Sequence, residues 1–141
     1  MKSFETLIRL RKHELDVARR ALSSLETRAD EIESRRIALE AEYAAETARA
    51  RGNVEASFVI GEYIIATRQR RHGIDREMNA LAQEIARAEA EVRDAFRELK
   101  RFELAAQQES DRVARQEQKR DQSLLDEVAL NGFRRDQKVQ A

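Results

Sequence analysis

The chain has 141 residues, with no proline, no cysteine, no tryptophan and only four glycines. Proline makes up about 5% of ordinary protein sequence, so about seven would be expected in a chain of this length. Ala, Glu, Lys, Leu and Arg supply 80 of the 141 residues, which exceeds the half that is typical of long helices and coiled coils. The composition therefore excludes a compact α/β domain and predicts one or two very long helices.

The charge balance excludes further classes of protein. There are 27 basic and 27 acidic residues, so the net charge is zero although 38% of the residues are charged. Nucleic-acid binders normally carry a basic excess, because contacts with phosphates supply most of their affinity. Without cysteine there is no disulfide framework and no thiolate zinc site, and no apolar run is long enough for a membrane span or a signal core. We therefore expect a cytoplasmic protein that does not bind nucleic acid.

An apolar pattern begins near the start of the chain and predicts a helix over residues 3–50. Its positions are separated by four and three residues in turn, and eleven of the fourteen are apolar. Such a 4-3 spacing, sustained over about six heptads, is typical of a coiled-coil seam. The fourteen positions are Phe4, Ile8, Arg11, Leu15, Ala18, Leu22, Leu25, Ala29, Ile32, Arg36, Leu39, Tyr43, Glu46 and Ala50.

The pattern fails over residues 51–60, where we predict a turn. This stretch contains Gly52-Asn53, which is typical of a helix end with a left-handed glycine, followed by a turn or cap residue. An alternative hairpin would turn at Gly73, near the middle of the chain. We prefer the turn at 51–60 because Ile60 and Ile64 already follow the second apolar pattern.

The second pattern predicts a helix over residues 61–131, which ends at Asn131-Gly132 and leaves a tail over 132–141. Thirteen of its sixteen positions are apolar: Ile60, Ile64, Thr67, Arg71, Ile74, Met78, Leu81, Ile85, Ala88, Val92, Ala95, Leu99, Phe102, Ala106, Glu109 and Val113. Two such seams bury their apolar positions most simply against each other. The expected fold is all-α: two long helices that form an antiparallel coiled-coil hairpin over residues 1–141, as a single domain.

The two arms have unequal lengths, so the hairpin should carry a C-terminal helical overhang beyond about residue 110. Residues 114–123 have almost no apolar side chain, and apolar residues return at Leu124, Leu125, Val128, Ala129 and Leu130. An apolar patch on an unpaired helix end indicates a binding surface for a partner.

Signs of chemistry are missing from the sequence. The two histidines, His13 and His72, should lie near opposite ends of the short arm, and no glycine-rich phosphate-binding loop is present. A hairpin two helices thick also lacks a concave pocket in which a reaction could be shielded from water. We therefore expect no catalytic, cofactor-binding or metal-binding residues, no cofactor and no enzymatic activity.

Three aromatic residues lie close to the predicted turn: Tyr43, Phe58 and Tyr63. They either fill the tip of the hairpin, where the helices splay, or form a docking patch, since aromatic residues are enriched at interfaces.

Several segments of the chain resemble the FliJ family of the bacterial flagellar type III export apparatus. The first is Phe4 with Leu7, Ile8 and Leu10 on a basic first helix. The second is the Gly52-Asn53 break followed by Ile60-Gly61-Glu62-Tyr63, and the third is the tail Lys119-Arg-Asp-Gln-Ser-Leu-Leu-Asp-Glu-Val-Ala129. The chain departs from the family pattern at Gly73 and where Ile60 and Ala66 replace aromatic residues.

The resemblance implies a non-enzymatic component that is similar to the central stalk of a rotary ATPase. Its open end would insert into the ring of the export ATPase FliI and promote assembly or activity, and its turn end would reach the export gate protein FlhA. It also implies an escort role for export chaperones, at the inner membrane of the flagellar base and attached there through partners only. The expected ATPase-binding residues are Leu7, Arg11, Lys12, Lys119, Arg120, Leu124, Asp126 and Glu127, and the expected gate-binding residues are Tyr43, Phe58 and Tyr63.

Two alternatives belong to other classes of function. One is a passive coiled-coil tether or homodimer that pairs through its overhang. The other is a helical arm that grips nucleic acid through Arg68, Arg70 and Arg71, although the zero net charge argues against it.

Overall fold

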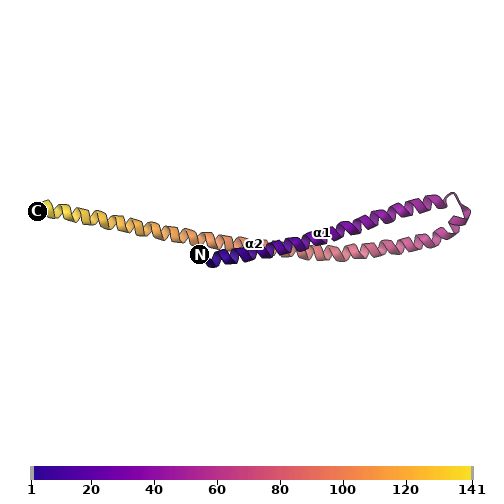
Figure 1. The fold of residues 1–141 in the computed structure, drawn as a ribbon, viewed down its shortest axis with the longest axis horizontal. Coiled ribbons are helices and arrows are strands. Elements are labelled where there is room, and N and C mark those ends of the chain that lie inside the picture. The colour runs from indigo at the N-terminus through magenta and orange to yellow at the C-terminus, as the bar shows by residue number, and fades with distance from the viewer. Residues whose placement is uncertain (1, 141) are drawn as a thin grey trace. The chain divides into compact units, whose positions relative to one another are not determined.

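The computed structural model describes residues 2–140, and it places nearly all of them in two helices. Helix α1 spans Lys2–Ala50 and helix α2 spans Val54–Gln140 (Figure 1). The all-α class and the two long helices are therefore confirmed. Contacts group the chain into two units, Arg11–Arg97 and Met1–Leu10 with Glu98–Ala141.

The unit Arg11–Arg97 is an antiparallel hairpin in which α1 and α2 run side by side away from the turn (Figure 1). Its buried apolar side chains are Leu15, Ile32, Leu39, Leu81 and Ala88, and all five are seam positions. Every other seam position in the two helices is at least half-buried. The 4-3 pattern therefore predicted correctly which side of each helix is buried.

Five ion pairs between α1 and α2 show that this unit keeps one register. In each pair the two residue numbers add up to 111 or 112. Pairs as exposed as these contribute little to stability, so their main effect is to favour one alignment of the two helices. The pairs are Arg28–Glu84, Arg35–Glu77, Arg36–Asp75, Arg70–Glu42 and Arg71–Glu40.

The turn covers only residues 51–53, so the predicted turn over 51–60 was too long. Two backbone bonds of the i→i−3 kind close the end of α1: Gly52 N donates to Arg49 O (3.4 Å) and Asn53 N donates to Ala50 O (3.3 Å). Asn53 then caps α2, because its Oδ1 accepts a hydrogen bond from Glu55 N (3.0 Å). This cap satisfies an amide in the first helical turn, so α2 begins at once.

The expectation of a left-handed Gly52 was wrong. No described residue, glycine or otherwise, has a positive φ. The i→i−3 bonds end α1 without the left-handed residue that many helix ends require. Gly73 lies inside α2, so the alternative turn at that residue is excluded.

The predicted helix end at Asn131-Gly132 was also wrong, because α2 continues to Gln140. One glycine inside a helix costs about 1 kcal/mol relative to alanine, and no proline follows to stop the helix. The last turn carries Lys138, whose charge is favourable near the negative end of the helix dipole. Residue 141 of the predicted tail lies outside the described residues.

The second unit contains both the start of α1 and the C-terminal part of α2. Here Leu99 is buried, and Phe4, Ile8, Phe102 and Ala106 are half-buried. After Val113 every described side chain is exposed as far as Val139, which confirms the predicted overhang. No described helix is apolar over a length sufficient to cross a bilayer.

The turn geometry generates a stability prediction for Gly52→Ala. A Cβ at Gly52 would meet nothing within 4 Å, and the backbone there needs no positive φ. The substitution should therefore stabilise the chain by about 0.4–1 kcal/mol, because alanine lowers the entropy of the unfolded chain. Urea unfolding followed by circular dichroism measures the change, with Gly61→Ala as a reference inside the helix. A loss of about 1 kcal/mol or more would instead indicate a left-handed Gly52.

Candidate functional site

The longest exposed segment of the chain is residues 114–139, which we call the C-terminal segment. Leu124, Leu125, Val128 and Phe133 are each between 60% and 64% exposed. All four side chains are therefore largely exposed, although each is as apolar as a residue of the buried seam. Exposed apolar residues that gather on one segment mark an interaction site more often than a plain surface.

The apolar side chains of the C-terminal segment do not continue the seam of the hairpin. Extending the seam spacing beyond Val113 leads to four polar residues, Gln116, Arg120, Ser123 and Glu127, before it reaches Leu130. At 3.6 residues per turn, Leu125 is turned by about 120° from the seam position Val113, and the face from Leu124 to Phe133 covers about half of the helix circumference. A two-helix coiled coil buries a narrower stripe than this. The segment therefore suits a partner that wraps around it better than a single packed helix.

Four of the eight expected ATPase-binding residues lie together. Lys119, Arg120, Leu124 and Glu127 line one shallow hollow on the surface of the C-terminal segment. Asp126 lies outside this hollow and accepts a hydrogen bond from Gln122 Nε2 (3.3 Å).

The three N-terminal members of that set do not join the hollow. Leu7 belongs to the same unit but is half-buried. Arg11 and Lys12 belong to the hairpin unit, where Arg11 forms an ion pair with Glu14 (2.8 Å). The structure thus brings Lys119, Arg120, Leu124 and Glu127 together in one hollow and leaves the other four expected residues as separate positions.

Near the turn, two of the three expected gate-binding residues contact each other. The rings of Tyr43 and Tyr63 stack with centroids 6.2 Å apart and an angle of 11° between the ring planes. The guanidinium of Arg71 lies 4.6 Å from the centre of the Tyr43 ring, a cation–π contact. Arg71 also donates two hydrogen bonds to Glu40, of 2.5 and 2.8 Å. We call Glu40, Tyr43, Tyr63 and Arg71 the Arg71 cluster.

Electrostatics follow from the geometry of the Arg71 cluster. The hydrogen bonds from Arg71 lower the pKa of Glu40, and those to Glu40 raise the pKa of Arg71. Because the guanidinium binds both carboxylate oxygens, the pair holds a more defined geometry than a single-contact ion pair. The sequence identified Arg71 as a polar seam position and as a candidate nucleic-acid-binding arginine, and it gave no sign of Glu40, since no local pattern connects residues 31 positions apart.

Two hydroxyl groups, one on Tyr63 of the cluster and one on Thr67, are buried without a hydrogen-bond partner. Thr67 is 1% exposed and its Oγ1 has no partner, and the same is true of the buried Tyr63 hydroxyl oxygen. A buried polar group left in this state costs about 1–3 kcal/mol. The tip of the hairpin is therefore less stable than its apolar seam suggests.

Phe58 does not join the tyrosine pair. It is 83% exposed, and its neighbour Val54 is 76% exposed. The tip also contains a hollow of about 220 Å³ between the end of α1 and the start of α2, lined in part by Ala50, Ile60 and Tyr63. Of the three expected gate-binding residues, Tyr43 and Tyr63 thus stack between the helices, and Phe58 is exposed to solvent.

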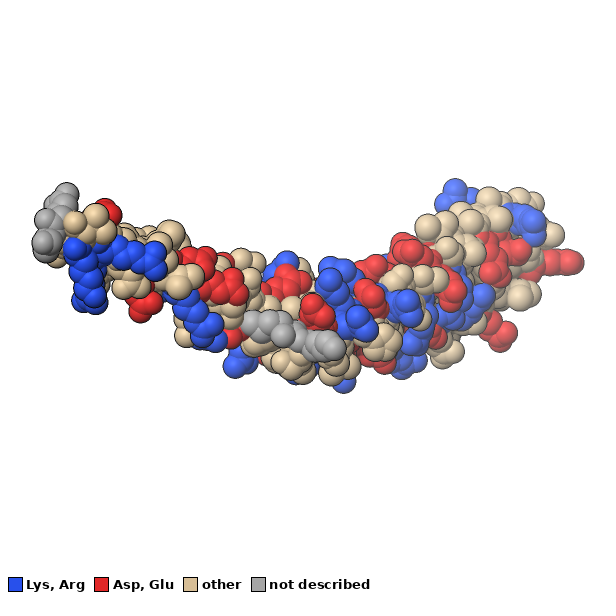
Figure 2. All heavy atoms as spheres, turned by 60° about the vertical axis from the view of Figure 1, so that its left-hand side comes forward, with Lys and Arg blue, Asp and Glu red and all other residues tan. Residues whose placement is uncertain are grey.

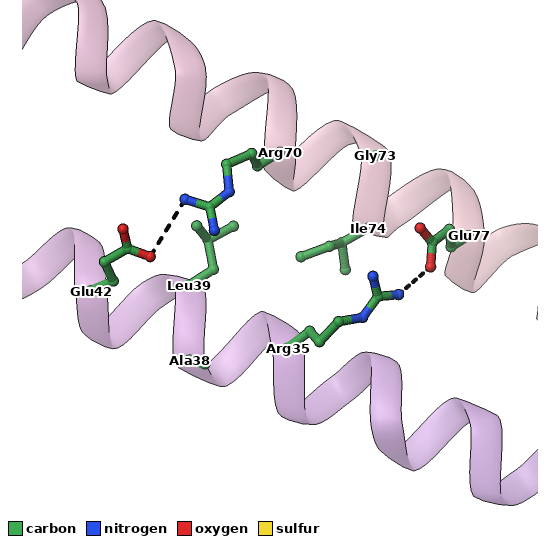
Figure 3. Close-up of a pocket in the computed structure, with 8 residues that line it drawn as sticks. All are labelled: Arg35, Ala38, Leu39, Glu42, Arg70, Gly73, Ile74 and Glu77. Carbon is green, nitrogen blue, oxygen red and sulfur yellow. Dashed lines mark hydrogen bonds and ion pairs between the residues drawn. The ribbon is translucent and has the colours of Figure 1, made fainter.

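The arginines of the nucleic-acid alternative do not form a continuous basic surface. Arg70 and Arg71 contact the carboxylates of Glu42 and Glu40. Figure 3 shows the Arg70–Glu42 and Arg35–Glu77 pairs on either side of Leu39 and Ile74, with Gly73 on α2 and Ala38 on α1. On the face drawn in Figure 2, basic and acidic side chains alternate along the chain. Among the described residues no group of three or more His, Asp or Glu side chains could hold a metal ion.

These features define the class of the protein: an all-α helical hairpin whose candidate sites are exposed helix faces rather than a cleft. A family model described as "Flagellar FliJ protein" matches residues 1–138. The chain belongs to the FliJ family, and membership implies a component of flagellar export.

Relatives and solved structures complete the comparison. Two curated proteins, both named "Flagellar FliJ protein" and from two strains of Caulobacter vibrioides, are each 27% identical over 125 residues. That match covers 89% of this chain and 90% of each relative. No solved structure matches the chain.

The Arg71 cluster generates a prediction about acid stability. A carboxylate whose pKa is lowered in the folded state stabilises that state above its unfolded pKa, and loses this effect as the pH falls through the folded value. The stability advantage of the natural chain over Glu40→Gln should therefore be full at neutral pH and shrink in acid. Urea unfolding at a series of pH values measures it, with Glu42→Gln as a control because its one contact is 3.4 Å long. An advantage that does not change with pH would contradict the assignment.

Proposed function

We propose that the chain is a non-enzymatic stalk of flagellar export whose C-terminal segment inserts into the ring of the export ATPase FliI. Insertion promotes assembly of the ring or its ATPase activity. The residues expected to contact the ring are Lys119, Arg120, Leu124, Asp126 and Glu127, together with Leu125, Val128 and Phe133, which share the exposed apolar face. Leu7, Arg11 and Lys12 contribute from the N-terminal side.

One observation carries this proposal: the exposed apolar face that covers about half of the circumference of the C-terminal segment. A ring of subunits covers such a face on all sides, whereas one additional helix covers only a narrow stripe. The polar stretch before Leu124 also supports insertion, because charged side chains suit the mouth of a ring, where water remains.

The turn end of the hairpin contacts the export gate protein FlhA in this proposal. Phe58 and Val54 present apolar surface there, and the stacked tyrosines belong to the same end of the hairpin. Contacts at both functional surfaces would couple ATP hydrolysis to proton-driven export. The chain would thus be held at the inner membrane of the flagellar base through its partners, and it would also escort export chaperones.

The passive tether remains the second candidate, because the same exposed segment could pair with a second copy of the chain. Light scattering distinguishes the two functions. A stable dimer at micromolar concentration, in which Leu124 and Val128 are buried between the two copies, would favour the tether. A monomer whose segment becomes protected only when the ATPase is added would favour the stalk.

A double substitution tests the stalk. In Leu124→Ser/Val128→Ser two exposed side chains lose their apolar surface, so folding should be unaffected. Each side chain contributes about 1.5–3 kcal/mol when fully buried, so the concentration needed for half-maximal stimulation of purified FliI should rise at least tenfold. ATP hydrolysis measured against added protein gives the readout.

The matched control for this experiment is Val17→Ser/Ile37→Ser, which alters side chains that are 50% and 63% exposed on α1. It removes the same kind of surface at positions outside the proposed site and should leave stimulation unchanged. Equal loss in both variants, or no loss in either, would contradict insertion of the C-terminal segment.

Phe58→Ala tests the gate contact. The ring is too exposed to support the fold, so the unfolding curve should stay the same. Binding to the purified cytosolic part of FlhA should weaken on the order of tenfold, the loss typical of an aromatic anchor at an interface. Calorimetry measures the affinity, and Ile37→Ala is the control. Unchanged affinity would remove Phe58 from the site.

A further inference from the structure

The seam changes character between the middle of the hairpin and its turn. We call residues 43–67 the tip segment. Six seam positions lie in it, and two of them, Glu46 and Thr67, are polar. The only fully buried side chain in this segment is Thr67, whereas Ile32, Leu39 and Leu81 are buried closer to the middle. The tip segment therefore lacks the buried aliphatic layers that hold the rest of the hairpin together.

Unpartnered polar atoms weaken the tip segment further. Thr67 Oγ1 and the Tyr63 hydroxyl oxygen are both buried without a hydrogen-bond partner. In water both would be hydrogen-bonded, so separation of the helices regains those bonds. The packed tip therefore has a free-energy cost, from two buried hydroxyls without partners, that is absent when the two helices separate there.

The tip also contains a surface hollow. The hollow of about 220 Å³ lies between the last turn of α1 and the first turns of α2, with Glu46, Ala50, Ile60 and Tyr63 among its lining residues. Hollows of about 310 and 190 Å³ also lie in the middle of the hairpin, so the hollow at the tip matters as volume that a partner's side chain can fill rather than as a sign of weaker packing. Ion pairs between the helices begin only at Glu42–Arg70 and Glu40–Arg71.

We propose that the tip segment opens as a local unit and that opening uncovers a docking seam for a helix of the membrane-side partner. The Glu40–Arg71 ion pair forms the boundary, because its two hydrogen bonds hold the helices together just outside the tip segment, whereas opening separates the stacked rings of Tyr43 and Tyr63. The uncovered seam contains Ile60, Ile64 and the two unpartnered hydroxyls. It fits an amphipathic helix that supplies apolar side chains and one or two hydrogen-bonding groups.

This inference rests on the proposed function only for the identity of the partner. In the closed hairpin the Tyr63 hydroxyl is inaccessible, so a partner reaches it only after the tip has opened. The partner then supplies what the hairpin lacks: volume for the hollow and partners for Thr67 and Tyr63. Opening itself is a property of the isolated chain and is measured without any partner.

Cysteine labelling tests the opening, because the natural chain contains no cysteine. Ile64→Cys and Ile85→Cys place a thiol at two half-buried seam positions of α2, one inside the tip segment and one outside it. The thiol at 64 should react with a maleimide at least tenfold faster than the thiol at 85. Adding Thr67→Val, which removes a buried hydroxyl at nearly constant volume, should slow labelling at 64 and leave labelling at 85 unchanged. Equal rates at both positions would overturn the proposal.

Hydrogen exchange on the natural chain gives a second measurement, free of any effect of the cysteines. Short helices separated from their partner are marginal in water, so amides of residues 44–66 should exchange about tenfold faster than those of residues 28–40 and 72–84. Uniform protection across these ranges would overturn the opening.

A disulfide lock tests the docking. The register of the ion pairs places Glu46 near Ile64 across the seam, so Glu46→Cys/Ile64→Cys can be closed by oxidation and reopened by reduction. The oxidised form should bind the cytosolic part of FlhA at least tenfold more weakly than the reduced form. Equal affinities would overturn docking at the seam. If the natural chain does not bind FlhA, the gate contact of the proposed function fails with it, and the labelling rates still decide whether the tip opens.

Discussion

Burial of one apolar seam between two antiparallel helices is the interaction on which the rest of the structure depends. The chain has few aromatic residues and a negative mean hydropathy of −0.75, so little else is available to bury. The apolar side chains that are buried, such as Leu15, Leu39 and Leu81, are single residues at separate positions along the seam. Each helix is long and charged on its other faces, and in proteins most of the stability of such a helix comes from packing of its apolar face. The ion pairs add alignment rather than adhesion, since all of them are partly exposed.

The end of the seam separates the supporting part of the molecule from the part available to partners. Beyond Val113 the seam positions are polar, from Gln116 to Glu127, and the apolar residues spread over about half of the helix circumference. A helix built only to lengthen the hairpin would keep its apolar residues in the seam spacing. The shift to Leu124, Leu125 and Val128 therefore separates two tasks along one helix: residues before it bury surface within the chain, and residues after it present surface outward.

Periodicity predicted most of the fold because burial on one helix face repeats along the whole chain, and that signal adds up over many turns. Helix ends were predicted less well, because they depend on single local bonds. Because Asn53 caps the helix, α2 begins at Val54 rather than at residue 61. Gly132 alone does not end α2, which continues to Gln140. Contacts between distant residues could not be predicted either, because they depend on the register of the hairpin: Glu40 contacts Arg71, and Tyr63 contacts Tyr43. The clustering of Lys119, Arg120, Leu124 and Glu127 was within reach, since residues three and four apart share a helix face.

Polar residues in the seam have opposite consequences at different places. Arg36 and Arg71 lie at seam positions, yet their charged groups reach Asp75 and Glu40 at the edge of the interface. Their stems cover apolar surface while the charges stay in water, so these positions align the helices at little cost. Thr67 is too short to reach an edge, and its hydroxyl stays buried without a partner. Substituting a longer polar side chain would remove that penalty by exposure, and valine would remove it by deletion. The chain has threonine at this position instead. Its unpartnered hydroxyl therefore lowers the stability of the turn end of the hairpin, the end that contains the exposed Phe58.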